Sequence, residues 1–211
     1  MCRLLYVRSR EEFEIEEYLS KFAGISKESK EFQGHGWGFA YRLNGKWEYY
    51  KNIMPVWEDN LSVFGKAEIV IAHARSAFQD KDIVVENNMP FYDDNSIFVF
   101  NGELRGVKIN EQGRIGAEKI YNFIKRFDKG DMLPALEKGI QIIDKRTDHI
   151  RAINIIIARE DKAYVTCFYN EDPDYFNLRY KKDDSTLVIC SDVFNGETGW
   201  KLIENKTTGV F

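Results

Sequence analysis

The order of strand-like and helix-like segments is the feature that most limits how this chain can fold. Apolar runs typical of strands come first, then two helical patterns, then strands again. The strand-like runs are residues 2–7, 67–74, 96–100, 150–158, 163–169, 187–190 and the last residues to 211, and the helical patterns are residues 117–127 and 133–143. Strands grouped in this way favour an α+β fold with largely antiparallel sheets, in which helices lie outside two stacked sheets.

Two local signals near the N-terminus refine this pattern. Asn44-Gly45 separates the strand-like residues 39–43 and 47–50, which predicts a tight hairpin. Ser9 precedes a glutamate by three residues, the spacing of a capping box, so we expect a helix to begin near Glu11. The apolar face of that helix would consist of Phe13, Ile15, Tyr18, Leu19 and Phe22.

Composition and charge exclude several functional classes. The chain has 211 residues, of which 44% are hydrophobic, and no linker or repeat divides it, so we expect a single domain over residues 1–211. A net charge of −4 with both signs interspersed lacks the basic footprint of a nucleic-acid binder. No apolar run approaches the roughly 20 residues that span a bilayer. We therefore expect neither a nucleic acid nor a membrane as a partner.

The cysteines indicate a compartment. The chain has three, at positions 2, 167 and 190, and none belongs to a CxxC motif. An odd number without such spacing argues against a disulfide framework and against a structural zinc site. The N-terminus also lacks the pattern of a signal peptide. These features predict a cytoplasmic protein whose Cys167 and Cys190 are small buried hydrophobes.

The cysteine at position 2 carries the first chemical hypothesis. Removal of Met1 would place a thiol and a free α-amine on the same residue. An α-amine has a reference pKa of roughly 7.7–8.0, which suits a general base at neutral pH. An N-terminal amine is also one recognised activator of a nucleophile. A buried structural cysteine is the alternative, and the Met-Cys start alone favours it.

Short motifs along the rest of the chain favour the catalytic interpretation. In sequence order they are Met1-Cys2-Arg3-Leu4-Leu5, Gly36-Trp37-Gly38, Ala72-His73-Ala74-Arg75, Glu86-Asn87-Asn88-Met89-Pro90-Phe91, Asn101-Gly102-Glu103-Leu104 and, more loosely, Ser191-Asp192 with Gly199-Trp200. In this order the motifs resemble those of the class II glutamine amidotransferases, which are N-terminal nucleophile hydrolases. The closest likeness is to the stand-alone glutaminase-like branch. The resemblance implies a four-layer αββα sandwich of two stacked antiparallel sheets flanked by helices.

The resemblance also implies three catalytic residues. Cys2 would be the nucleophile, and its own α-amine would be the base. Asn101 and Gly102 would form the oxyanion hole, because the first offers a side-chain amide and the second a backbone N–H that no Cβ obstructs. The alternative for the Asn-Gly pair is an ordinary turn after a strand.

Arg75, Glu103 and His73 are the expected substrate-binding residues. Arg75 ends an apolar strand, where a charged group needs a partner. The matching arginine of the family holds the α-carboxylate of the substrate, and a guanidinium suits that task because it binds a carboxylate bidentately. A salt bridge to Glu86 or Glu103 is the structural alternative. His73 faces the same side of the strand as Arg75, and we expect it to be a scaffold residue, since the base is already supplied. For His35, contact with the N-terminal amine and a loop-filling role both stay open.

Three positions depart from the family pattern. Met89 and Phe100 stand where the family often has histidine. Gly116 stands where the family has the aspartate that binds the α-ammonium of glutamine. Burying an unpaired ammonium is costly, so a glutamine pocket needs a replacement carboxylate. The candidates are Glu118, Glu103 and Asp192.

These features lead to three functional hypotheses. In the first, the chain hydrolyses the side-chain amide of glutamine or a related compound through a Cys2 thioester, without a metal or an organic cofactor. The ammonia would be released or passed to a separate synthase subunit. In the second, the same chemistry acts on a γ-glutamyl or other small carboxylated amide, as the change at Gly116 suggests. In the third, the chain is a catalytically silent relative that serves as a binding or regulatory subunit.

Overall fold

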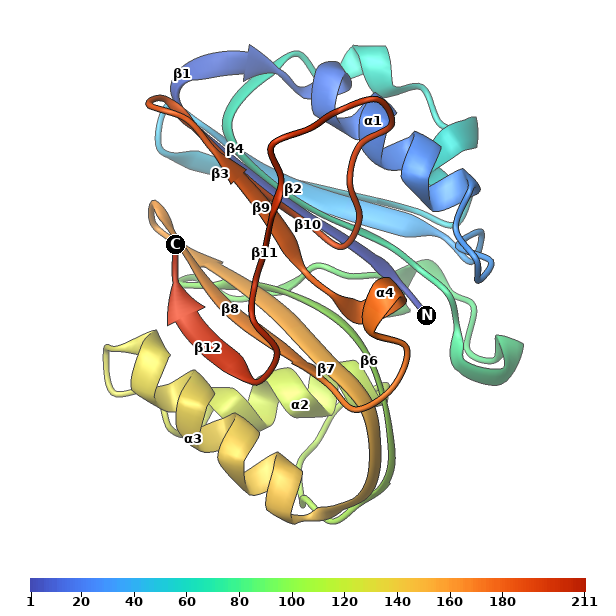
Figure 1. Cartoon of the computed structure of the whole chain (residues 1–211), viewed down its shortest axis with the longest axis vertical. Helices are drawn as coiled ribbons and strands as arrows, with labels where there is room; N and C mark the ends of the chain where they lie inside the picture. Colours follow the sequence, from blue (N-terminus) through green and yellow to red (C-terminus); the bar gives the residue numbers. More distant parts are fainter.

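Two antiparallel sheets are stacked face to face in the computed structural model, which describes residues 1–211 (Figure 1). The larger sheet has seven strands in the order β11-β9-β10-β1-β4-β2-β3, and the smaller has five in the order β12-β8-β7-β6-β5. The strands are β1 (Arg3–Glu14), β2 (Trp37–Leu43), β3 (Lys46–Asn52), β4 (Lys66–Ala74), β5 (Phe91–Tyr92), β6 (Ile97–Val107), β7 (Thr147–Arg159), β8 (Lys162–Tyr169), β9 (Arg179–Lys182), β10 (Thr186–Cys190), β11 (Lys201–Leu202) and β12 (Thr207–Val210).

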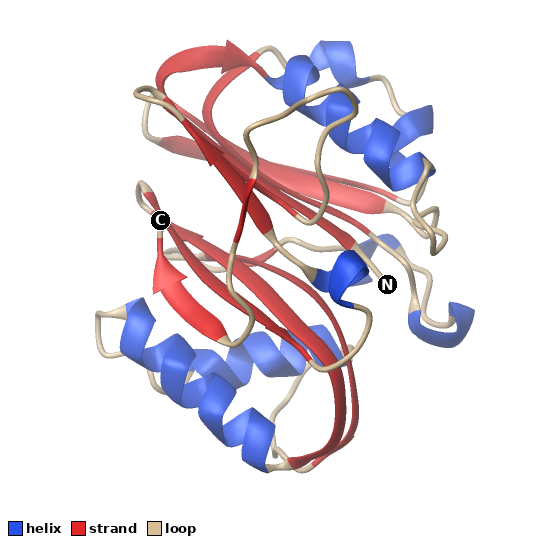
Figure 2. Ribbon diagram, in the orientation of Figure 1, coloured by secondary structure: helices blue, strands red, loops and turns tan.

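Helices cover the outer faces of both sheets (Figure 2). Helix α1 (Ile15–Lys27) lies on the larger sheet, and α2 (Gly116–Lys125) and α3 (Met132–Lys145) lie on the smaller one. The short α4 (Pro173–Phe176) lies beside the N-terminus (Figure 1). Four 3₁₀ turns complete the chain, at Val56–Glu58, Leu61–Val63, Phe78–Asp80 and Val85–Asn87. The predicted αββα sandwich is therefore confirmed. None of its helices combines the length and apolar character needed to cross a membrane.

Strand alternation separates the two faces of the larger sheet and fixes the direction of Cys2. In β1, Leu5 and Val7 belong to the apolar cluster that includes α1, whereas Leu4 and Tyr6 belong to the cluster that includes the smaller sheet. Successive side chains of a strand point to opposite faces. Cys2, which immediately precedes β1, therefore lies on the side of Leu4 and Tyr6, between the sheets.

The same alternation directs two further motifs into the space between the sheets. In β4, Ile69 and Ile71 pack in the inter-sheet cluster, so His73 follows them on that face. In β6, Phe98 stacks on Tyr121 of α2 with ring centroids 4.9 Å apart, which places Phe98 on the outer, helix-covered face. Asn101 lies an odd number of residues further along β6 and points inward.

The start of the first helix differs from the prediction. The expected beginning near Glu11 is wrong, because β1 continues to residue 14 and α1 begins at Ile15. Pairing between β1 and β4 is interrupted after Arg8 and resumes at Phe13, so tertiary hydrogen bonds extend the strand. The predicted apolar face is nevertheless used, since α1 buries Ile15, Leu19 and Phe22.

Two turn signals have different outcomes. The Asn44-Gly45 hairpin is confirmed: both residues have positive φ, at 52° and 74°, as a tight primed turn requires. Asn101-Gly102 is not a turn, because β6 continues through it to Val107 and pairs with β7 along its length. The pair therefore lies inside a rigid strand.

Candidate active site

Cys2 meets the smaller sheet through its backbone. The N–H of Cys2 donates a hydrogen bond of 2.8 Å to Oδ1 of Asn101 in β6. The other side-chain atom of this amide, Asn101 Nδ2, is buried and has no hydrogen-bond partner in the protein. A buried donor without an acceptor costs free energy, so such groups commonly mark a functional position. The Asn101 amide is thus anchored to Cys2 at one end and free to donate at the other.

The thiol of Cys2 lies against the loop that follows β4. Cys2 Sγ donates to the carbonyl oxygen of Ser76 at 3.6 Å, and the N–H of Ser76 donates to Sγ at 3.4 Å. Burial raises the pKa of the thiol, while the N-terminal ammonium, the Ser76 backbone and Arg75 act in the opposite direction. A thiol with a raised pKa is mostly protonated at neutral pH, so its use as a nucleophile requires a base.

Gly102 lies where two strands approach closely. A Cβ at this position would collide with the carbonyl oxygen of Ala152 in β7 and with the ring of Phe100. Glycine is therefore required by the packing of β6 on β7, independently of any catalytic role. This position also puts the Gly102 backbone next to Asn101 in the same strand.

Arg75 carries a buried positive charge with neutral partners only. The residue is 5% exposed, and no carboxylate lies within ion-pair distance of its guanidinium. Burial lowers its pKa, and Cys2 and Asp82 act against this effect. The guanidinium donates to Asp82 O at 2.9 Å, Asn88 Oδ1 at 3.3 Å and Val84 O at 3.5 Å.

Glu103 belongs to a different arginine. Its Oε1 pairs with Arg105 at 2.5 Å, and its Oε2 lies 3.6 Å from Arg151. The salt bridge between Arg75 and Glu103 or Glu86, which was the structural alternative for Arg75, does not form. Arg75 is an expected substrate-binding residue that does lie beside the Cys2 thiol, because the next residue, Ser76, contacts Sγ. Glu103 instead pairs with Arg105 and lies near Arg151.

The two histidines support the site without acting at its centre. His73 is fully buried, and burial, followed by the charge of Arg75, lowers its pKa to about 3, so it is neutral at physiological pH. It therefore suits the expected scaffold role better than that of a base. His35 Nδ1 accepts a hydrogen bond of 2.9 Å from the N–H of Ala77, and the N–H of His35 donates to Arg75 O at 3.1 Å. His35 thus orders the loop around Arg75 and makes no hydrogen bond to the N-terminus.

The positions that depart from the family pattern are apolar or open. Met89 and Phe100 are buried in the core that includes the smaller sheet. Gly116 is the first residue of α2, and a Cβ there would meet no group within 4 Å. Each proposed replacement carboxylate is engaged by an arginine: Glu118 by Arg114 at 2.6 Å, Glu103 by Arg105 at 2.5 Å and Asp192 by Arg3 at 3.0 Å.

Met1 is held by residues that sequence reasoning missed. Its ammonium pairs with Glu31, and its carbonyl oxygen accepts hydrogen bonds from Gln33 Nε2 and, at 2.6 Å, from the Tyr175 hydroxyl. Gln33 is fully buried and Tyr175 is 6% exposed. These residues are far apart in the sequence and belong to no shared motif, so no local signal identifies them.

Comparison with solved structures identifies the architecture. A glutamine aminotransferase class-II domain protein from Silicibacter pomeroyi matches with a TM-score of 0.67 and 12% identity, over 97% of this chain and 92% of that protein. A predicted glutamine amidotransferase from Pseudomonas aeruginosa matches with a TM-score of 0.66 and 16% identity, over 100% of this chain and 97% of that one. The chain has the class II glutamine amidotransferase fold.

A larger enzyme contains the same fold as one part. The glutamine phosphoribosylpyrophosphate amidotransferase of B. subtilis matches with a TM-score of 0.63 and 17% identity, over 90% of this chain and 42% of that protein. This chain therefore spans less than half of that enzyme. No protein-family model and no curated protein matches the sequence. The likeness to class II glutamine amidotransferases is thus one of fold.

Proposed function

We propose that the chain is a cysteine-dependent amidohydrolase that hydrolyses the side-chain amide of glutamine or a related compound through a thioester on Cys2, releasing ammonia. One observation carries the proposal. The Asn101 side chain accepts from the Cys2 N–H at 2.8 Å while its own buried Nδ2 lacks a partner. A nucleophile and an unoccupied oxyanion donor are thereby joined through one amide group.

The chemistry follows from the atoms of Cys2 and β6. Removal of Met1 converts the Cys2 nitrogen from an amide into an amine, which then accepts the thiol proton, directly or through water. Sγ attacks the amide carbon, and Asn101 Nδ2 with the Gly102 N–H stabilises the oxyanion. As the C–N bond breaks, the proton on the α-amine passes to the leaving nitrogen. Water then hydrolyses the thioester, forming the acid and restoring the thiol.

Arg75 supports a carboxylated substrate. A buried guanidinium with only neutral hydrogen-bond acceptors retains an uncompensated positive charge, which a carboxylate would neutralise. The adjacent residue Ser76 contacts Cys2 Sγ, so an anion bound at Arg75 lies near the nucleophile. This arrangement favours a small amide with a carboxylate at the end remote from the scissile bond.

A γ-glutamyl or other substituted amide is the second candidate. Gly116 offers no carboxylate at the start of α2, and Glu118, in the first turn of that helix, is engaged by Arg114. The α-ammonium of free glutamine therefore lacks a counter-charge at that place. A γ-glutamyl compound whose α-amino group is modified, or another carboxylated amide without that group, avoids this cost.

Three measurements test the proposal. We expect an intact mass without Met1, ammonia release from a panel of small amides, and covalent labelling of Cys2 by a glutamine-like electrophile that excess substrate blocks. Cys2→Ala should abolish hydrolysis, whereas the matched variant Cys167→Ala, in strand β8, should retain it. Retention of Met1 together with absence of labelling would contradict the proposal and favour a silent binding or regulatory subunit.

A further inference from the structure

Met1 fills a space whose walls have the features of a binding site, and we call this space the recess. Glu31 pairs with the Met1 ammonium, and the fully buried Gln33 and the nearly buried Tyr175 donate to its carbonyl oxygen. The Met1 side chain packs against the apolar cluster of Ala152, Tyr175 and Phe176. The recess thus supplies one carboxylate, two neutral donors and an apolar wall, all of which Met1 uses.

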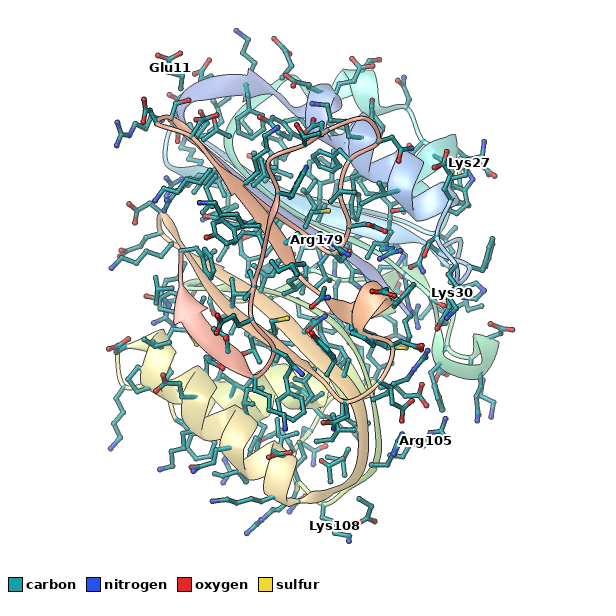
Figure 3. All side chains as sticks on the ribbon, in the orientation of Figure 1. Glu11, Lys27, Lys30, Arg105, Lys108 and Arg179 are labelled. Atoms are coloured by element: carbon teal, nitrogen blue, oxygen red, sulfur yellow. The ribbon has the colours of Figure 1, made fainter.

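The charges around the recess require a cation. Four carboxylates surround the guanidinium of Arg151, which contacts Glu31 at 3.0 Å, Glu103 at 3.6 Å, Glu171 at 3.8 Å and also Asp172. The other permanently charged side-chain cations of this cluster are Lys30, which lies 3.7 Å from Asp172, and Arg105, which pairs with Glu103. The His149 imidazole lies 3.2 Å from Glu171 and adds a positive charge only when it is protonated. Figure 3 shows Lys30 and Arg105 on the edge of the molecule where the chain begins.

The Met1 ammonium is therefore the fourth positive charge in a cluster of four carboxylates. Removal of Met1 moves the terminal nitrogen to Cys2, and while that amine is neutral, as its role as the base requires, the cluster has one carboxylate in excess. Glu31 is the carboxylate that loses its direct partner. A partly buried carboxylate without a counter-charge favours binding of a cation.

We propose that removal of Met1 creates a binding site for a cationic amine beside Cys2, and that this site holds the leaving amine of an N-substituted amide substrate. This inference rests on the proposed function and names the substrate class of the same site. Besides the nitrogen of the scissile amide, the leaving amine has a second, positively charged group that pairs with Glu31. The apolar arm between the two nitrogens packs against Tyr175 and Phe176. An acceptor oxygen on that arm would meet Gln33 and Tyr175.

The direction of proton transfer places the leaving amine in this recess. The Cys2 α-amine donates its proton to the leaving nitrogen, so the two nitrogens approach within about 3 Å. Asn101 Oδ1 occupies one side of the Cys2 nitrogen, and the carbonyl carbon of Met1 occupied another. A substituent on the leaving nitrogen therefore extends into the space that Met1 vacated. The C–S bond forms, the amide C–N bond breaks, and the leaving nitrogen takes the one proton held by the α-amine and departs as a neutral primary amine whose second, remote amino group carries the positive charge.

A binding experiment tests the recess without catalysis. The full chain is prepared from a cleavable fusion in two forms, one beginning at Cys2 and one retaining Met1, and each is titrated calorimetrically with L-methioninamide. We expect binding to the form that begins at Cys2, at least about tenfold weaker binding of the uncharged N-acetyl-L-methioninamide, and no binding to the form that retains Met1. Equal affinities for the two probes, or undiminished binding when Met1 is present, would overturn the proposal.

Matched variants locate the charge responsible. Glu31→Gln should remove the preference for the cationic probe. Glu171→Gln should preserve it, because Glu171 contacts Nε of Arg151, whereas Glu31 contacts Nη1, and the Met1 ammonium pairs with Glu31. Loss of the preference in both variants would mean that the net charge of the cluster, rather than Glu31, selects the amine, which contradicts the proposed site.

A kinetic experiment separates this inference from the proposed function. The γ-glutamyl amides of 1,4-diaminobutane and n-pentylamine have arms of equal length, and the first ends in a charged amine where the second ends in a methyl group. We expect kcat/KM for the first to exceed that for the second by about tenfold, and this ratio to approach one in Glu31→Gln. If Cys2→Ala abolishes hydrolysis but the wild-type ratio is already one, the proposed function stands and the inference fails. If neither amide nor glutamine is hydrolysed and Cys2 resists labelling, both fail.

Discussion

Two arginines near the start of the chain, the buried Arg75 and the half-buried Arg151, have surroundings that are opposite in charge. Arg75 precedes the Ser76 loop that holds the thiol, and it donates only to two backbone carbonyls and one amide oxygen. Arg151 lies on the side of Met1 and is surrounded by four carboxylates. The positive charge of Arg75 therefore has no negative partner, whereas the positive charge of Arg151 has four negative neighbours.

This difference shows that the partners of an arginine decide its use, more than its burial does. A guanidinium among neutral acceptors suits an incoming anion, because binding supplies the missing counter-charge. A guanidinium among excess carboxylates orients those carboxylates and leaves a net negative site that suits a cation. We accordingly assign the anionic end of the substrate to the Arg75 region and its cationic leaving amine to the Arg151 region.

The largest expected effect comes from Asn101, where the two regions meet at Cys2. Asn101→Ala removes both the acceptor for the Cys2 nitrogen and the free donor, and kcat should fall about 10²- to 10³-fold. Asn101→Asp retains the acceptor but not the donor, so its kcat should fall by a comparable factor. The measurement is kcat for ammonia release by protein whose circular dichroism is native. Wild-type kcat in Asn101→Asp would show that Nδ2 does not stabilise the oxyanion.

A smaller effect should follow from Arg75→Lys, which tests whether the unpaired positive charge of Arg75 binds the substrate carboxylate. Lysine keeps the charge but loses the planar fork, so KM for a carboxylated amide should rise about 10- to 100-fold while kcat changes little. The same variant should leave KM unchanged for an amide without a carboxylate. An equal rise in KM for both substrates would mean that Arg75 orders its loop rather than binding the substrate.

The smallest expected effect is on stability. It tests the carboxylate cluster around Arg151 in the chain that retains Met1. Arg151→Gln should lower the free energy of unfolding by about 1–3 kcal/mol at pH 7, measured by urea denaturation. The more exposed Arg105→Gln should cost less, since its side chain is 65% exposed.

The loss of stability in Arg151→Gln should depend on pH in a definite direction. Burial acts to raise the pKa of Glu31, but its bonds to the N-terminal ammonium and Arg151 outweigh burial and lower the pKa below the ordinary 4.5. A carboxyl with a lowered folded-state pKa contributes stability that is present above its unfolded pKa and is lost as the pH falls through the folded value. The gap between wild type and Arg151→Gln should therefore narrow below pH 4.5. An unchanged gap would contradict the charge-based account of the cluster.

Local patterns predicted most elements because their signals are short-range. Asn44-Gly45 specified its hairpin through backbone conformations that both residues adopt readily. The helix start failed for the opposite reason. Ser9 Oγ does accept from the N–H of Glu11 at 3.3 Å, but β4 pairs with residues beyond this point and extends the strand. A capping signal cannot outweigh hydrogen bonds to a strand more than fifty residues away.

The candidate site was predictable in its parts but not in its connections. The motifs singled out Cys2, Arg75 and Asn101, and the fold brings the Cys2 nitrogen to Asn101 and the thiol to the residue after Arg75. Strand alternation, read from the sequence, already placed His73 and Arg75 on one face. Which carboxylates meet which arginines depends on the stacking of the two sheets, and the sequence left those pairings open.

The sequence by itself determined the alternation of apolar faces, the hairpin and the presence of a cysteine that becomes N-terminal when Met1 is lost, because each depends on neighbouring residues. Only the tertiary structure decided that Asn101 accepts from Cys2, that Arg75 has no carboxylate and that Glu31, Gln33 and Tyr175 enclose Met1. The physical reason is distance along the chain. Electrostatic and hydrogen-bond partners are chosen by proximity in space, and two stacked sheets bring together residues that no local pattern relates.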